Sequence, residues 1–337
     1  MKRFLLLVVI LITPFLAYSQ GDSNIENPVV ADTLPANTTL YKINDSVAYL
    51  IEKPTPFRYI PYAGRDLWEG PKQLFRKESI LPVAGVTAST LILIAFDEKI
   101  TARVQQFCRW INLSPSNNAK NISPVEGVPF WVPTDLSSGL YYIGDGITEC
   151  SINAGFYIYG LVKKDNRALR TAAQLSEGLI SVGIMVQILK HVSGRATAYA
   201  NNGKDMWRWF PSPSRYTKSV PWYDAFPSGH LAIAMTTVTI ISSNYPEKRW
   251  IKPVGYSLMG LCGFQMINNG VHWAGDYPLA ILMGYGFGKL ISSRGKTEIK
   301  YKDFPELQAR YNNRPKLKLS PTYLYNSVPA LSLSLKF

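Results

Sequence analysis

Hydrophobic residues between about residue 78 and residue 292 recur at the three- and four-residue spacing that is typical of α-helices. Runs with this spacing predict helices over 78–96, 100–111, 139–162, 168–192, 230–244, 254–266 and 277–292, the first two as a helix pair. The helix over 168–192 is expected to end at Gly194, since glycine readily takes the left-handed conformation that terminates helices. The pattern therefore predicts an all-α helical bundle.

The segments outside this bundle follow other patterns. Scattered prolines over residues 20–76 predict an extended leader with little core of its own, and four prolines over 114–138 predict a long loop. Residues 316–325 and 331–337 alternate apolar with polar side chains, which predicts a short C-terminal β-hairpin around Asn326 and Ser327. We therefore expect a helical domain over 77–295 and a tail over 296–337.

The first residues have the features of a secretory signal peptide. Lys2 and Arg3 precede the apolar run 4–16, and Ala17, Tyr18 and Ser19 give the small-x-small pattern of a cleavage site. The apolar run is short for a membrane-spanning helix. We expect residues 1–19 to be removed and the protein to be exported to the cell envelope, in the periplasm or in a membrane with its site facing the periplasm. An uncleaved membrane anchor is the alternative.

The net charge of the chain restricts the classes of molecule that it is expected to bind. A formal net charge of +13 favours nucleic acid, anionic lipid headgroups or phosphorylated substrates, and export argues against nucleic acid. Most of the apolar runs are shorter than about twenty residues, and the mean hydropathy of −0.02 is low for a protein with many spans. We expect membrane association, with a soluble bundle as the alternative.

Candidate chemistry lies at the predicted helix ends. The chain has three histidines, and one of them, His230, follows Ser228 and Gly229 in a turn that opens a helix. Free backbone N–H groups at such a turn can bind an anion. His272 and Asp276 are four residues apart and share one helix face. The carboxylate can then hold one ring nitrogen while the other acts as a nucleophile.

Cationic side chains lie at the end of the preceding long helix. Lys190 supplies a point charge and Arg195 a planar fork, and both suit phosphate oxygens. Residues 197–226, which are rich in Trp, Tyr, Pro and basic residues, are expected to form a cap over this site. A packed surface loop is the alternative.

In chain order, the lysine with its neighbouring arginine, the Pro-Ser-Gly-His turn at 227–230 and the His272–Asp276 pair resemble the three motifs of the type 2 phosphatidic acid phosphatase and vanadium haloperoxidase superfamily. The resemblance covers roughly residues 78–292. It implies a phosphatase that needs no metal or cofactor and acts on a phosphorylated lipid or a small phosphoester.

The same resemblance implies a role for each matching residue. His272 would be the nucleophile that forms a phosphohistidine, Asp276 would orient its ring, and His230 would protonate the leaving oxygen. The phosphate oxygens would be held by Lys190, Ser228 and the Gly229 N–H.

Two arginines of the family pattern are replaced. The chain has Thr197 and Ala198 where the first motif has arginine and proline, and Met266 where the third has arginine. A hydrogen bond to a charged group is worth roughly 1.5–3 kcal/mol, so losing two would slow catalysis roughly a hundred- to ten-thousand-fold. Arg195 is the expected substitute, with Arg208 and Arg215 as further candidates. Three functions stay open: an active phosphatase, a vanadate-dependent haloperoxidase, and a non-catalytic envelope protein that binds anions or lipids.

Overall fold

The structure is a computed structural model that describes residues 37–122, 130–201, 203 and 206–300, and two strands at 316–324 and 328–336. Residues 1–36, which include the predicted signal peptide, lie outside the described residues. Helices make up most of the described part, and the strands pair only in small antiparallel sheets. The all-α fold class is therefore confirmed.

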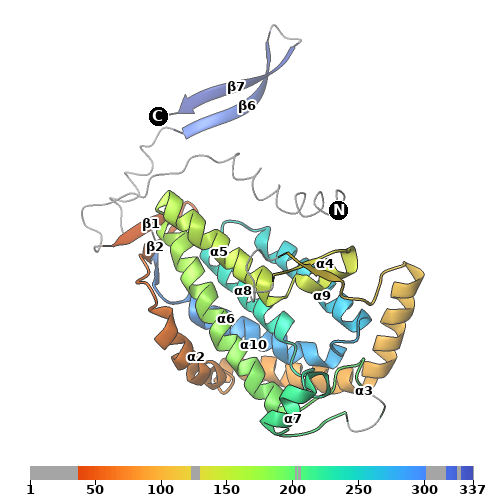
Figure 1. The fold of residues 1–337 in the computed structure, drawn as a ribbon. Helices are drawn as coiled ribbons and strands as arrows, with labels where there is room; N and C mark the ends of the chain where they lie inside the picture. Colours follow the sequence, from red (N-terminus) through yellow and green to blue (C-terminus); the bar gives the residue numbers. More distant parts are fainter. Residues whose placement is uncertain are drawn as a thin grey trace.

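Five helices form the centre of the molecule (Figure 1). They are α5 (Gly146–Lys163), α6 (Asn166–Ser193), α8 (Gly229–Asn244), α9 (Ile251–Asn268) and α10 (Tyr277–Ser292). Helix α8 packs against α10, α6 and α9, and α5 packs on α6. Their shared core is apolar because Val182, Leu231, Ile240, Met266 and Phe287 all turn inward and are almost fully buried.

The ends of these helices follow from local chemistry. Gly194 ends α6 in the left-handed region, with φ of 52°, as the sequence predicts. Asp165 begins α6, since its carboxylate accepts the N–H groups of Arg167 and Ala168. Ser228 begins α8, and its hydroxyl accepts the N–H of Leu231 at 3.5 Å. Helix α10 has the predicted limits.

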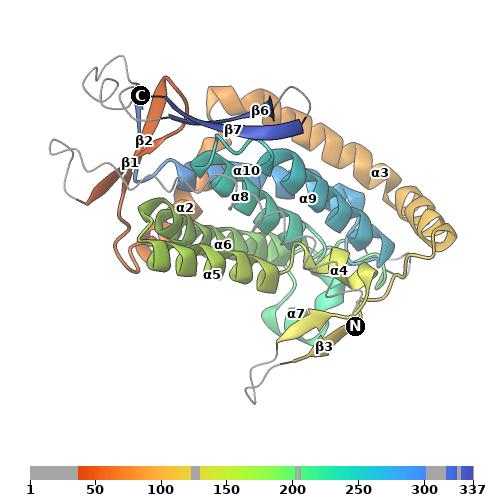
Figure 2. The ribbon, with the colours of Figure 1, turned by 90° about the horizontal axis from the view of Figure 1, so that it is seen from above.

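The predicted helix pair over 78–111 is wrong, because this segment forms one helix, α3 (Ile80–Trp110), after the short 3₁₀ turn η1 (Lys77–Ser79). Figure 2 shows α3 as one long element along one side of the molecule. The charged residues 97–99 do not interrupt it, since they include neither glycine nor proline. Asp97 in fact faces the protein and is buried.

The predicted extended leader is also wrong where the structure describes it. Residues 38–73 form β1 (Thr38–Lys42), β2 (Val47–Glu52) and α2 (Tyr59–Gln73). Strand β2 lies between β1 and β5 (Lys296–Lys300) in an antiparallel sheet, and it buries Ala48 and Ile51. Helix α2 packs on α6 and α10. The segment therefore packs with the bundle. The sequence did not predict this, because the scattered prolines interrupt the pattern of apolar residues.

The predicted loop over 114–138 contains a small hairpin of β3 (Ala119–Asn121) and β4 (Trp131–Pro133). The helix predicted over 139–162 is divided into α4 (Leu136–Tyr142) and α5. Asp145 separates the two, because its carboxylate accepts the Ile147 N–H at 2.9 Å and starts α5. This break allows α4 to pack on α9 while α5 packs on α6.

The C-terminal β-hairpin is confirmed. Strands β6 (Lys316–Leu324) and β7 (Val328–Lys336) pair antiparallel, with Leu319 opposite Leu333. The predicted turn residues Asn326 and Ser327 lie outside the described residues.

Two of the described helical segments are long and apolar enough to cross a membrane, Lys77–Trp110 and Asn166–Ser193. They differ in burial. The most apolar window of the first has no buried residue, whereas half of the corresponding window in α6 is buried. Side chains such as Leu81, Leu91 and Trp110 of α3 are exposed. Helix α3 therefore presents an uncovered apolar surface, while α6 is largely a core helix.

Candidate active site

Two of the three histidines come together in the structure. His230 lies in the first turn of α8, and His272 lies just before the 3₁₀ turn η3 (Ala274–Asp276). Their ring centroids are 6.1 Å apart and the rings are nearly perpendicular. The two rings therefore belong to one cluster of side chains. The sequence prediction that these residues share one site is consistent with this placement.

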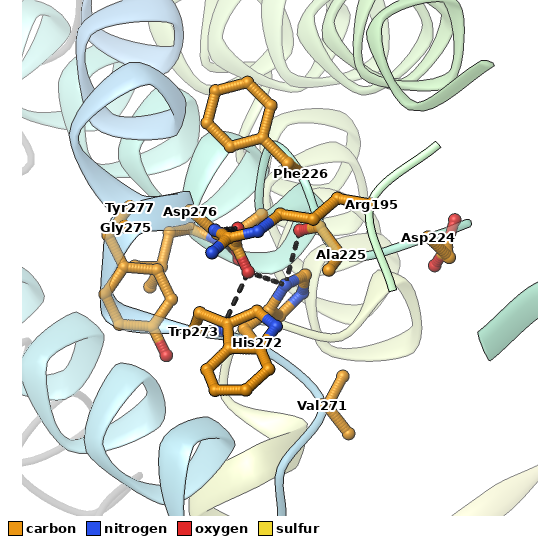
Figure 3. A network of polar contacts seen from close by, with 12 residues as sticks. Arg195, Asp224, Ala225, Phe226, Val271, His272, Trp273, Gly275, Asp276 and Tyr277 are labelled. Atoms are coloured by element: carbon orange, nitrogen blue, oxygen red, sulfur yellow. Dashed lines mark hydrogen bonds and ion pairs between the residues drawn. The ribbon is translucent and has the colours of Figure 1, made fainter. Parts of the chain in front are cut away.

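The hydrogen bonds of His272 determine which of its nitrogens is available. Nδ1 lies 2.8 Å from the carbonyl oxygen of Ala225 and 3.3 Å from Oδ2 of Asp276. A carbonyl oxygen only accepts hydrogen bonds, so Nδ1 carries the proton and Nε2 keeps its lone pair. Figure 3 shows both partners on the same side of the ring. The Ala225 carbonyl is a functional group that sequence reasoning missed, since a backbone oxygen leaves no side-chain signal.

The carboxylate of Asp276 is held by two other groups besides His272. Its Oδ2 accepts the N–H of Trp273 at 2.8 Å, and its Oδ1 accepts Nη1 of Arg195 at 2.5 Å. The second terminal nitrogen of Arg195, Nη2, donates to Oδ2 of Asp97 on α3 at 2.5 Å. Arg195 and Asp276 are fully buried and Asp97 nearly so. Two carboxylates therefore share one buried guanidinium next to the histidine.

This placement corrects the expected role of Arg195 as a phosphate clamp. Both of its terminal nitrogens are occupied by carboxylates, and its guanidinium lies 4.8 Å from the ring centre of Trp207. Only Nε is left without a hydrogen-bond partner within the described part of the chain. Arg195 therefore bridges Asp97 and Asp276 instead of presenting a two-pronged fork to an anion.

Lys190 is a residue of α6, and its ammonium group lies near the start of α8. Its Nζ donates to Oδ2 of Asp224 at 2.7 Å, and it lies 3.9 Å from the position that a Cβ would take on Gly229. The ammonium group is thus close to the free N–H groups at the helix N-terminus. Ser228 is buried, and its own N–H donates to the Asp276 carbonyl at 3.1 Å. This backbone hydrogen bond joins the start of α8 to the turn η3.

His230 is buried beside these positive groups. Burial first, then the neighbouring His272 and Lys190, lower the pKa of its imidazole to about 3. Its Nε2 is buried and has no hydrogen-bond partner among the residues described, and the ring packs 4.7 Å from that of Tyr141. An anion bound between the two histidines would supply the missing partner and the negative charge that favours protonation.

The two positions at which the family pattern has arginine are both buried. The side chain of Met266 belongs to the apolar core, while its carbonyl accepts the backbone N–H groups of Val271 and His272. Thr197 donates its backbone N–H to the Pro221 carbonyl. Both positions therefore support the backbone near the site but bring no charge to it.

Residues 206–224 run beside the end of α6. Arg195 forms backbone bridges with Trp207 and with Asp224. The guanidinium of Arg208 lies 4.2 Å from the ring centre of Trp222, and its Nη1 is buried without a partner within the described ranges. Arg215, on α7 (Pro213–Lys218), is exposed. Of the two further candidates, only Arg208 therefore has a buried nitrogen without a partner among the described residues.

The third histidine belongs to a different surface. His191 stacks on Tyr216 with ring centroids 3.9 Å apart, and its Nδ1 lies 2.8 Å from the Gln187 carbonyl. It lines an open apolar groove with Ile184 and Phe210. Within the described ranges, no group of three or more His, Cys, Asp or Glu side chains is placed to hold a metal ion.

The fold is a helical bundle in which two histidines, a lysine and a helix N-terminus lie close together. Residues 171–299 match the model of the PAP2 superfamily. The family resemblance predicted from the three motifs is thereby confirmed over this part of the chain. The match includes Lys190, His230 and His272 but not α3.

No match was found among curated proteins. Among solved structures, the chain is similar to the crystal structure of the first transmembrane PAP2 type phosphatidylglycerolphosphate phosphatase from Bacillus subtilis, with 16% sequence identity and a TM-score of 0.34. That alignment covers 67% of this chain and 96% of the other.

Proposed function

We propose that the protein is a metal-independent phosphatase that hydrolyses lipid or polyprenyl phosphate and diphosphate monoesters through a phosphohistidine on His272. The observation that carries this proposal is the approach of the His230 and His272 rings to 6.1 Å beside Lys190 and the start of α8. The PAP2 superfamily match supports the same class of reaction.

The hydrogen bonds of the site suggest how the reaction proceeds. The Nε2 lone pair of His272 attacks phosphorus, and the bond between phosphorus and the leaving oxygen breaks as His230 gives that oxygen a proton. His230 then takes a proton from water, whose oxygen attacks the phosphohistidine. The phosphorus–nitrogen bond breaks, phosphate leaves, and Nε2 regains its lone pair. Nδ1–H stays on the Ala225 carbonyl throughout.

The charges in the site suit this sequence of steps. Lys190 and the backbone N–H groups at the start of α8 would hold the phosphate oxygens on which charge gathers in the transition state. Asp276 would stabilise the positive charge that the imidazole ring acquires when Nε2 is phosphorylated. Because Nδ1 is fixed by two acceptors, the ring would be held ready for attack without a large rearrangement.

A lipid substrate and an envelope location complete the proposal. The uncovered apolar surface of α3 would contact the acyl region of a membrane. The sequence features of residues 1–19 support export, with the site facing the periplasm. Residues 77–295 would form the phosphatase domain, and the preceding strands β1 and β2 and helix α2 would pack against it.

The test is phosphate release from a short-chain lipid phosphate and from a polyprenyl diphosphate in the presence of EDTA. We expect turnover in the wild type and its loss in His272→Gln. The matched control is His191→Gln, which changes a histidine outside the site and should keep full activity. A phosphoryl group trapped on residue 272 during turnover would identify the intermediate. No release from any lipid phosphate or diphosphate would reject the proposal.

A non-catalytic anion-binding protein is the second candidate, because Met266 and Thr197 bring no charge to the site. It predicts that sulfate or vanadate binds to the wild type and that no lipid phosphate is hydrolysed. Turnover that depends on His272 excludes it.

A further inference from the structure

We propose that Asp97, in the middle of α3, is a positioning residue for His272 that acts through Arg195 and through the backbone of the turn η3. Asp97 lies outside the segment that matches the family model. The kinetic part of this inference rests on the proposed phosphatase function, whereas its electrostatic part can be measured without turnover.

The carboxylate of Asp97 holds two groups at once. Its Oδ2 accepts Nη2 of Arg195 at 2.5 Å, and its Oδ1 accepts the N–H of Gly275 at 2.9 Å. Arg195 in turn bonds Asp276, whose other oxygen faces His272. All four residues that make these contacts are at most 1% exposed. Asp97 is thus connected to the histidine by one route through side chains and another through the backbone of η3.

The turn η3 rests directly on α3. A Cβ added to Gly275 would lie 2.7 Å from a side-chain carbon of Ile94 and 2.9 Å from Oδ2 of Asp97. Only a residue without a Cβ lets the turn approach the helix so closely without displacing it. The backbone on which His272 and Asp276 stand is therefore seated against α3 at the position of Asp97.

Asp97 also changes the charge beside His272. Burial raises the pKa of the Asp97 carboxyl, and the hydrogen bond and charge of Arg195 oppose that shift. With Asp97 and Asp276 both ionised around the single positive charge of Arg195, the group has one net negative charge. That charge favours a positively charged imidazole ring. Without Asp97, Arg195 would neutralise Asp276 alone, and the stabilisation of a cationic ring would weaken.

The charged and titratable groups that face His272 come from several elements. They are Asp276 from η3, Tyr277 from the start of α10, Arg195 just after α6, Asp97 from α3, and His230 from α8 with Lys190 near it. Removing the charge of Asp97 alters one member of this set and leaves the others in place.

The experiment compares Asp97→Asn with Asp66→Asn. Both residues are buried carboxylates that pair with an arginine, but Asp66 lies on α2 and pairs with Arg294. We expect Asp97→Asn to lower kcat roughly ten- to hundredfold with little change in KM. NMR of the imidazole nitrogens should show the midpoint of the His272 titration at lower pH in Asp97→Asn than in the wild type. The chain has only three histidines, and His272→Gln assigns the signal. Asp66→Asn should leave kcat and the titration unchanged.

Equal effects of the two variants on kcat, or an unchanged His272 titration in folded Asp97→Asn, would overturn the inference. Absence of turnover in the wild type would reject the phosphatase function, while the titration would still test the role of Asp97. Gly275→Ala provides a second route if Asp97→Asn does not fold. It pushes η3 away from α3 without changing any charge, so kcat should fall while the protein stays folded. A folded Gly275→Ala protein with wild-type kcat would contradict the proposed seating of the turn.

Discussion

At the scale of single residues, His230 is expected to change its charge when an anion binds. Its pKa of about 3 keeps the imidazole neutral in the free protein, and a bound anion would raise that pKa. Between the free and the bound pKa, binding therefore takes up a proton, and affinity falls as pH rises. We predict that sulfate binding near pH 5 takes up about one proton.

Calorimetry in two buffers with different ionisation enthalpies measures this uptake. His230→Gln should abolish it, and His191→Gln should retain it. Sulfate binding that involves no proton in the wild type would show that His230 does not become the acid of the reaction.

Arg208 is expected to contribute to anion binding in place of the arginines that the family pattern has and this chain lacks. Its Nη1 is buried without a partner in the part of the chain that the structure describes, and its guanidinium lies over Trp222. We predict that Arg208→Ala weakens sulfate binding roughly tenfold or more, because a charged donor is lost. Arg215→Ala changes an exposed arginine of the same loop and serves as the control. Equal affinities of the two variants would exclude this role for Arg208.

The sequence identified the residues whose side chains form motifs. It did not identify the groups that hold those side chains in place. The lysine, the turn at 227–230 and the pair His272–Asp276 could be identified because their side chains and spacing form recognisable motifs. The partner of Arg195 could not, since Asp97 is 98 positions away along the chain. The Ala225 carbonyl could not either, because any residue type would supply it. Distant ion pairs and backbone acceptors become visible only once the chain is folded.

At the scale of elements, α3 shows why the helix boundary at residue 97 was misplaced. A charged triplet within an apolar run resembles the end of a helix when every charge is assumed to face water. Asp97 instead faces the bundle and is compensated by Arg195, so the helix continues. The long helices of the bundle core were predicted more closely, because their limits coincide with capping residues such as Ser228 and Gly194.

Glu149 on α5 predicts a pH-dependent contact between α5 and α8. The side chain is buried, its Oε2 accepts the Thr237 hydroxyl at 2.6 Å, and burial raises its pKa to about 7. The folded state therefore binds a proton more tightly than the unfolded state does, so the stabilisation falls as pH rises from about 4.5 to about 7. Glu149→Gln should raise the free energy of unfolding at pH 8 by about 1–3 kcal/mol.

Denaturant unfolding at pH 5 and at pH 8 checks this expectation, with Glu98→Gln as a control on the exposed face of α3. The gain of Glu149→Gln at pH 8 should largely disappear at pH 5. A gain of equal size at both pH values would mean that ionisation of Glu149 is not its source.

At the scale of the whole molecule, the uncovered apolar surface of α3 predicts binding to a bilayer. Leu91 and Ile92 are exposed on this helix, and a charge within the hydrocarbon costs roughly 2.5–3.5 kcal/mol. A Leu91→Glu, Ile92→Glu double variant should therefore leave the lipid fraction in vesicle flotation. Ile122→Glu, which changes an exposed apolar residue outside the helix, should float like the wild type. Unchanged flotation of the double variant would place the membrane contact elsewhere.

Because α3 is one continuous helix, its length also predicts how deep His272 would lie in a bilayer. Residues 80–97 of the helix span about 26 Å at 1.5 Å per residue, which is close to the roughly 30 Å thickness of the hydrocarbon layer. A helix that enters this layer at Ile80 would leave it near Asp97, and α6 ends at Ser193, just before the arginine to which Asp97 is paired. Both helices would then bring His272 level with the lipid headgroups. For the proposed phosphatase, this depth would let an amphiphile bring its phosphate to His272 while its hydrocarbon tail stays in the bilayer, so the substrate would not need to be extracted from the leaflet.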